Sequence, residues 1–181
     1  MDQDRLILRL DGRNLMKRLM TVVALSAGLA ACGGERSGTI ETGDGDTAEY
    51  SIDQDGTETT TTVETADGKM TIQTGEGGDV ALPEGFTVYP GAKVTSNMSV
   101  DGGDGKGTMI TMQSDASPED MVAHYRKQAV AAGYKISMEM NNDSNRIIAG
   151  ETSSGEGGFT FSAGPSGDGT AAQLMIGDSF R

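Results

Sequence analysis

A single helix-length segment constrains the fold of this chain most strongly. After residue 32, only residues 117–133 are long enough and suitably patterned for an α-helix. Ser117 suits the N-cap, Pro118 the first helical position, and Gly133 a left-handed C-terminal cap. The apolar stripe of this helix is Val122, Tyr125, Ala129 and Ala132. Parallel strands need long crossover connections, which are usually helical, so a chain with one such helix predicts an antiparallel sheet.

Short alternating segments separated by Gly-, Asn- and Ser-rich turns surround the predicted helix. Residues 81–181 contain 26 Val, Ile, Leu, Met, Phe and Tyr residues, enough to bury a core. The expected strands are 93–101, 107–114, 134–140, 145–152, 158–164 and 170–177. We therefore predict an α+β domain over residues 81–181, with one helix packed across an antiparallel sheet.

Residues 39–80 form a second, weaker segment that is acidic and rich in Thr, Gly and Asp. Only seven large apolar residues occur between positions 33 and 80, so disorder is the alternative to structure there. Polar and apolar residues nevertheless alternate, and Asp55-Gly56 and Asp67-Gly68 suit tight turns. We predict a three-stranded β-meander with one weakly apolar face. Because such a ribbon is barely stable alone, we expect it to dock on the face that the helix leaves uncovered, or on a partner.

The beginning of the chain has the pattern of an export signal. Met16-Lys17-Arg18 is positively charged, and residues 19–31 are uncharged, apolar and too short to span a bilayer. Asp2, Asp4 and Asp11 are unusual in such a leader, so Met16 is the expected start. We predict a leader and signal peptide over residues 1–31.

The end of this signal resembles the lipobox of bacterial lipoproteins. Leu29, Ala30 and Ala31 stand where the lipoprotein signal peptidase recognises its substrate, directly before Cys32. The resemblance implies cleavage before Cys32 and lipidation of that residue, with residues 32–38 as a tether. Gly33, in place of aspartate, implies an outer-membrane location, with the domain expected to face the periplasm.

Charge and cysteine content narrow the possible partners. The first 31 residues hold five basic and three acidic residues, which leaves nine basic and 24 acidic residues, a formal charge of −15, in the rest. This charge repels phosphate backbones, so we exclude nucleic acid as a partner. Cys32 is the only cysteine, so no internal disulfide can form, and lipidation would consume its thiol.

A second resemblance concerns residues 82–181. Tyr89-Pro90-Gly91-Ala92, two strands, a helix starting at Ser117-Pro118 and its ending in Ala132-Gly133-Tyr134 are similar to a YPGA-type domain of uncharacterised secreted bacterial proteins and lipoproteins. The resemblance supports the predicted fold and implies no activity.

Candidate sites are few. His124, the only histidine, falls away from the apolar stripe, so we expect it at the surface. Met138-Glu139-Met140 suggests a copper(I) ligand pair, but with Ile136 the two methionines more simply form an inward-facing core row.

Acidic side chains suggest two further kinds of site. The Asp-rich turns suggest calcium, although the loop at Asp53 and Asp55 lacks the bidentate glutamate of an EF-hand. A pair of carboxylates would be needed for an enzyme acting on envelope polymers, and no spacing selects one among Glu84, Glu151, Glu156 and Asp178.

We therefore expect no enzymatic activity, no catalytic residue, no metal site and no cofactor. The expected function is that of a lipid-anchored cell-envelope protein, held in the membrane through Cys32, that acts as an interaction or structural module with an envelope protein as partner. The alternative is a periplasmic protein that binds calcium or another small ligand.

Overall fold

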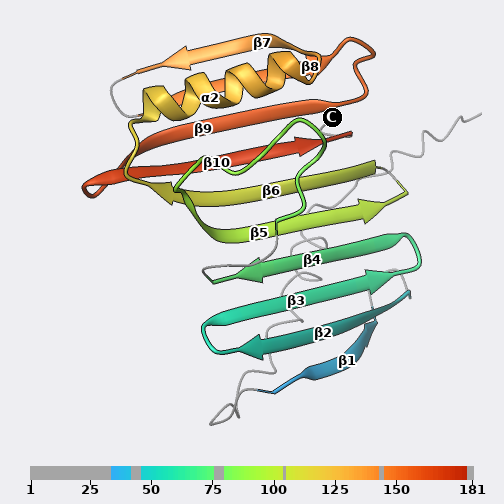
Figure 1. The fold of residues 1–181 in the computed structure, drawn as a ribbon. Coiled ribbons are helices and arrows are strands. Elements are labelled where there is room, and N and C mark those ends of the chain that lie inside the picture. The colour runs from blue at the N-terminus through green and yellow to red at the C-terminus, as the bar shows by residue number, and fades with distance from the viewer. Residues whose placement is uncertain (1–33, 42–45, 76–79, 104, 143–144, 179–181) are drawn as a thin grey trace, which may run out of the picture. The chain divides into compact units, whose positions relative to one another are not determined.

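The computed structural model describes residues 34–41, 46–75, 80–103, 105–142 and 145–178. Within these ranges, ten strands form one antiparallel sheet and helix α2, Pro118–Ala131, lies on one side of it (Figure 1). The predicted α+β class is confirmed. The strands are β1 Arg36–Glu41, β2 Thr47–Asp55, β3 Glu58–Thr65, β4 Gly68–Thr74, β5 Lys93–Gly102, β6 Gly105–Ser114, β7 Tyr134–Asn141, β8 Arg146–Thr152, β9 Gly158–Ser166 and β10 Gly169–Gly177.

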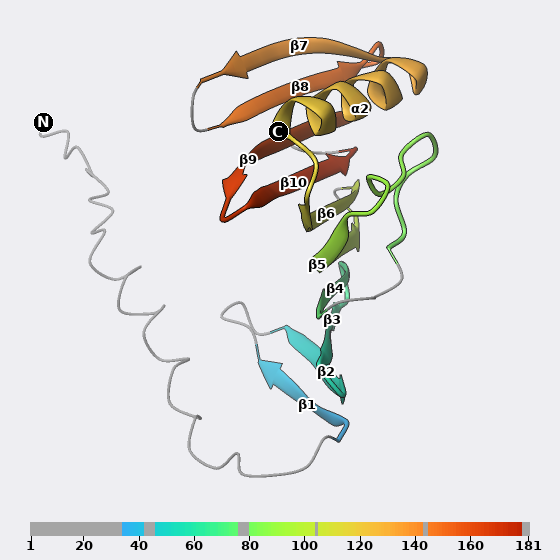
Figure 2. The same cartoon turned by 60° about the vertical axis from the view of Figure 1, so that its left-hand side comes forward.

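The strand order is β1-β2-β3-β4-β5-β6-β10-β9-β8-β7. The first six strands follow one another along the sheet. The chain then passes through α2 to the opposite edge at β7 and returns by hairpins until β10 pairs with β6, as Figure 2 also shows. All neighbours are antiparallel, as expected for a chain whose single helix makes the only long connection.

The N-terminal meander does not lie on a face of the sheet, as we predicted, but at its edge. It has four strands rather than three, and instead of covering a face it lengthens the sheet, because β4 pairs with β5 from Gly68↔Gly102 to Thr74↔Ser96. The outer edge of β5 would otherwise present unpaired N–H and C=O groups, and β4 satisfies them. Strand β1 begins at Arg36, so positions 36–38 of the expected tether are part of the sheet.

Helix α2 begins and ends as its sequence predicts. Ser117 is the N-cap: its side chain accepts a hydrogen bond from the Asp120 N–H over 3.1 Å. Gly133, just beyond the C-cap Ala132, has a φ of 87°, which glycine adopts without strain. The buried residues of the helix are Met121, Tyr125 and Ala129. Met121 is therefore central to the buried face, whereas Val122 is only half-buried.

The hydrophobic core lies between the sheet and α2, which packs on β7, β8 and β9. Part of the β4–β5 connection, residues 80–92, crosses the same side of the sheet and adds Phe86 to the core (Figure 1). The core residues are Phe86, Ile110, Met112, Met121, Tyr125, Ala129, Ile148, Phe159, Phe161, Ala163, Ala172, Leu174 and Ile176. None of them belongs to β1–β4, so the meander stands outside this core.

Candidate interaction surface

The residues of the predicted lipidation site, Leu29, Ala30, Ala31 and Cys32, lie outside the described residues, as do the leader and Met16. The description begins at Gly34, two residues before β1. Among the described helices, none is long and apolar enough to cross a membrane.

Side chains fill the helix-covered side of the sheet. The ring of Tyr125 stacks on Phe161 with 4.3 Å between ring centroids, and its hydroxyl lies 3.5 Å from the Met112 sulfur. The same oxygen accepts a hydrogen bond from the Tyr89 N–H over 3.1 Å. Burial raises the pKa of Tyr125 to about 12. Tyr125 therefore stays neutral and structural at physiological pH.

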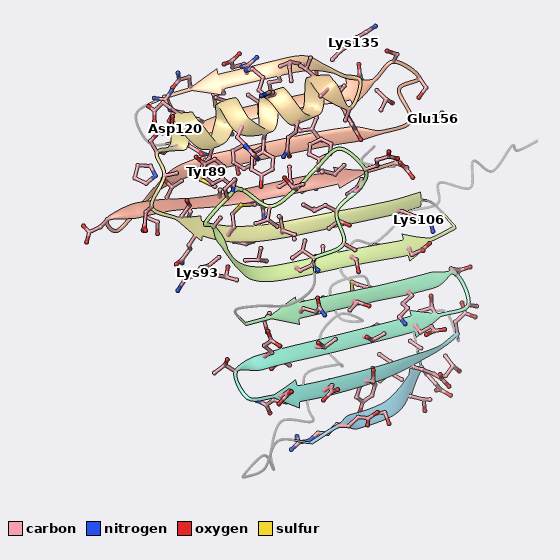
Figure 3. The ribbon with its side chains drawn as sticks, viewed as in Figure 1. Tyr89, Lys93, Lys106, Asp120, Lys135 and Glu156 are labelled. Carbon is pink, nitrogen blue, oxygen red and sulfur yellow. The ribbon has the colours of Figure 1, made fainter. Side chains whose placement is uncertain are left out.

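His124 is half-buried rather than at the surface as expected. Its ring lies edge-on to the ring of Tyr89, with 4.9 Å between the centroids (Tyr89 is labelled in Figure 3). Its Nε2 lies 3.0 Å from the Gln128 Nε2. Burial, and to a lesser extent the charge of Lys127, lowers the pKa of His124. The neighbours of His124 are thus an aromatic ring and a side-chain amide, which suits a packed neutral imidazole.

The acidic candidates remain dispersed. Glu84, Glu151, Glu156 and Asp178 are all exposed, so these four form no buried carboxylate pair. Asp53 and Asp55 are exposed on β2, and Asp101 pairs with Lys106 at 2.7 Å. Within the described ranges no three His, Cys, Asp or Glu side chains gather closely enough to hold a metal ion. Asp44, Gly45 and Asp104, which belong to two further Asp-rich segments, lie outside those ranges.

The side of the sheet turned away from α2, here called the open face, combines apolar side chains with few charges. Alternation along each strand and the register between strands place its members. Its apolar side chains are Ile40, Ala48, Tyr50, Ile52, Val63, Met70, Ile72, Met98, Val100, Met109, Met138, Met140, Ile147, Ala149, Ala171 and Met175. Four of the five large hydrophobic residues that are exposed in the described chain belong to it: Ile40, Val100, Met138 and Met140.

Methionines concentrate on the open face. It carries six of the eight methionines that follow Cys32. Three of them form a row across adjacent strands, because Met98 pairs with Met109 and Met109 pairs with Met175. Methionine is flexible and polarizable and is over-used at adaptable binding surfaces. Antiparallel sheets that face water usually carry polar side chains there, so this composition makes the open face the candidate interaction surface.

Charged side chains occur on the open face only near strand ends. On the described strands they are Arg36, Lys93, Lys135 and Glu151 (Figure 3 labels the two lysines). The opposite side of the meander is acidic, with Glu49 directly across from Glu64. Charge is therefore segregated between the two sides of the sheet, and the apolar side is nearly free of carboxylates.

The predicted inward row of Ile136, Met138 and Met140 is wrong, because β7 contains a bulge. The register shifts between Ile136↔Gly150 and Met138↔Ala149, which inserts one extra residue and reverses the alternation. Ile136 packs against the core, whereas Met138 and Met140 are 45% and 47% exposed. Burial in the core was the reason to disfavour a copper(I) site at these two methionines, and that reason no longer applies.

Ion pairs hold the bulged strand against the helix. After the bulge, Glu139 lies on the helix side, where its carboxylate pairs with Arg126 of α2 at 2.5 Å. Arg146 of β8 similarly joins Glu119 of α2 and the Asn141 side chain. These contacts join β7 and β8 to α2, and the bulge leaves Met138 and Met140 facing outward on an edge strand.

A family model described as START domain-like matches residues 94–171, fewer than half of the 181 residues. The match spans β5, β6, α2, β7, β8, β9 and the first residues of β10, and it leaves out the meander. No curated protein and no solved structure matches the chain. The match thus coincides with the part of the sheet that carries the helix.

Proposed function

We propose that this chain is a lipid-anchored protein of the bacterial cell envelope, without enzymatic activity, that acts as an interaction module through its open face. The proposed anchor is Cys32 and the proposed location is the outer membrane, with the domain facing the periplasm. The partner is an envelope component, and nucleic acid is excluded by the charge of −15 that follows residue 31.

The open face is the observation that carries this proposal. A broad apolar surface on an otherwise acidic chain favours association, because burying it removes apolar area from water without burying carboxylates. The helix-covered side supports the same conclusion, since the hydrophobic core lies between the sheet and α2. A small-ligand site at that position would need room that Tyr125, Phe159 and Phe161 fill.

The proposed anchor would hold the sheet close to the membrane. Three residues lie between Cys32 and Arg36, where β1 begins, and the four residue steps of an extended chain span about 14 Å. Strand β1 is an edge of the sheet, so the meander would lie nearest the lipid. The nine strand spacings of about 4.8 Å would put β7 up to about 43 Å further away.

Cross-linking in intact cells, with the wild type and Cys32→Ser compared, tests this proposal. Each sample is then fractionated into membranes and analysed by mass spectrometry. We expect wild-type protein in the outer membrane with a lipid-modified Cys32 and a reproducible cross-linked species that the variant loses. A wild-type protein that carries no lipid and stays outside the membrane fraction would refute the anchor.

A further inference from the structure

We infer that the partner that covers the open face is the open face of a second copy of this chain. This inference rests on the proposed function, because it names the occupant of the same surface. It follows from three features of the molecule: an uncovered layer in the meander, the distribution of charge, and the area available.

Strands β1–β4 form a layer that nothing covers within the described residues. They contribute no side chain to the core cluster between the sheet and α2, and α2 packs mainly on β7, β8 and β9. Ala48 is their one buried apolar residue. Their helix-side surface is polar, with Ser51, Thr62 and Thr71 among its members. Globular domains are built from at least two packed layers, so the apolar side of this ribbon requires a second layer.

The distribution of charge selects a second copy as that layer. Two copies that met through their helix-side meander surfaces would bring together carboxylates such as Glu49 and Glu64, which repel. Two open faces meet without that cost, because their charged residues lie near strand ends. A two-fold interface needs a surface that complements itself, and a methionine-rich face whose few charged residues lie near strand ends satisfies that requirement.

The open face is large enough for a stable dimer. Ten strands at a spacing of about 4.8 Å, each about 8 residues long on average at about 3.4 Å per residue, give a face of about 1,300 Å². Stable interfaces bury about 800 Å² on each partner. Sheets of the same twist pack face to face about 10 Å apart, with interdigitating side chains. The dimer would thus be a β-sandwich formed between two chains.

The oligomeric state of residues 33–181 tests this inference. Gly33–Arg181 is a compact unit that contains every described element. Sedimentation equilibrium over a range of concentrations up to about 100 μM should show a monomer–dimer equilibrium. A chain that stays monomeric throughout this range would overturn the inference.

Matched variants locate the interface. Met98→Glu and Val100→Glu place a carboxylate on the open face of β5 and should weaken dimerisation at least 10-fold. Val100 is already 40% exposed, so the fold tolerates a charge there. Ser99→Glu adds the same charge on the other side of the strand and should change the dissociation constant less than about 2-fold. A dimer that both open-face variants leave intact would overturn the inference.

Two further outcomes separate this inference from the proposed function. If the protein is monomeric and position 98 cross-links to a different envelope protein in cells, the inference that a second copy covers the open face is wrong. The proposal that the chain is an interaction module is then supported. If the monomer instead binds vesicles of phosphatidylethanolamine and phosphatidylglycerol through the open face, a lipid surface replaces the second copy. A monomer that neither cross-links nor binds vesicles would refute both.

Discussion

The Tyr125 hydroxyl and the Tyr89 backbone N–H, 36 residues apart in the sequence, are joined by a hydrogen bond of 3.1 Å. The bond fixes the β4–β5 connection to the middle of α2. Tyr125 is fully buried, so the connection depends on a polar atom that has no access to water.

Replacement of Tyr125 by phenylalanine tests this link. The change keeps the ring that stacks on Phe161 but leaves the Tyr89 N–H without its acceptor. We expect a loss of about 1–3 kcal/mol in the free energy of unfolding, measured by urea titration. Tyr134→Phe is the control, because its ring also packs in the core, against Phe86 and Phe159. An equal loss in both variants would contradict the assigned role of the Tyr125 hydroxyl.

The same hydroxyl predicts a dependence of stability on alkaline pH. An unfolded tyrosine has a pKa of about 10, whereas burial raises the pKa of Tyr125 to about 12. Between these values the unfolded chain loses a proton that the folded chain retains, so the free energy of unfolding falls as pH rises. The loss should approach roughly 2–3 kcal/mol at pH 12 and be absent below pH 10.

Other lysines and tyrosines also titrate in this range, so the informative quantity is a difference between variants. The alkaline decline of the wild type should exceed that of Tyr125→Phe, measured by urea unfolding at each pH. Identical declines would show that Tyr125 titrates normally in the folded protein.

A glycine on the edge strand β1 makes room for a tyrosine side chain. Gly38 lies opposite Tyr50, and a Cβ at Gly38 would stand 2.8 Å from the Tyr50 hydroxyl oxygen and 2.9 Å from its ring. Gly38→Val should therefore displace the Tyr50 side chain, weaken the β1–β2 pairing and increase amide hydrogen exchange in residues 36–55. Adding Tyr50→Ala should remove the clash and reduce the effect. Gly103→Ala is the control, since its Cβ would meet nothing closer than 3.9 Å.

Gly150 has the same role inside the sheet. A Cβ there would lie 2.4 Å from the Lys135 carbonyl oxygen and 2.7 Å from the Phe159 ring. Gly150→Ala should lower the free energy of unfolding by about 3 kcal/mol, because neither backbone nor packed ring can move freely. Gly158→Ala, whose Cβ would approach only to 3.8 Å, should cost much less in the same denaturation experiment. Equal costs would show that the two strands adjust.

The helix and most strands were predictable because they depend on local signals. Ser117, Pro118 and Gly133 mark the ends of α2, and Asp55-Gly56 and Asp67-Gly68 both lie at hairpin turns. The predicted β8 and β10 agree with the observed strands to within one residue. Turn chemistry and helix capping act over a few residues, so a single sequence is enough to reveal them.

The errors arose where long-range pairing decides the structure. Alternation in the meander gives an apolar side but cannot show whether the ribbon stacks on the sheet or pairs with the edge of β5. The β7 bulge at Ser137 is equally invisible, because a one-residue insertion changes no composition yet reverses the direction of every following side chain. The open face could not be predicted from the sequence, because only the register between strands places Met98, Met109 and Met175 side by side.

Site-specific photo-cross-linking in intact cells tests the central claim, that the open face is the binding surface of an anchored protein, most directly. A photoreactive residue is placed at Met98, on the open face, and separately at its neighbour Ser99, which faces the other way. We predict a discrete cross-linked product in the membrane fraction from position 98 and none from position 99. A product from position 99 alone, or none from either position, would contradict the claim.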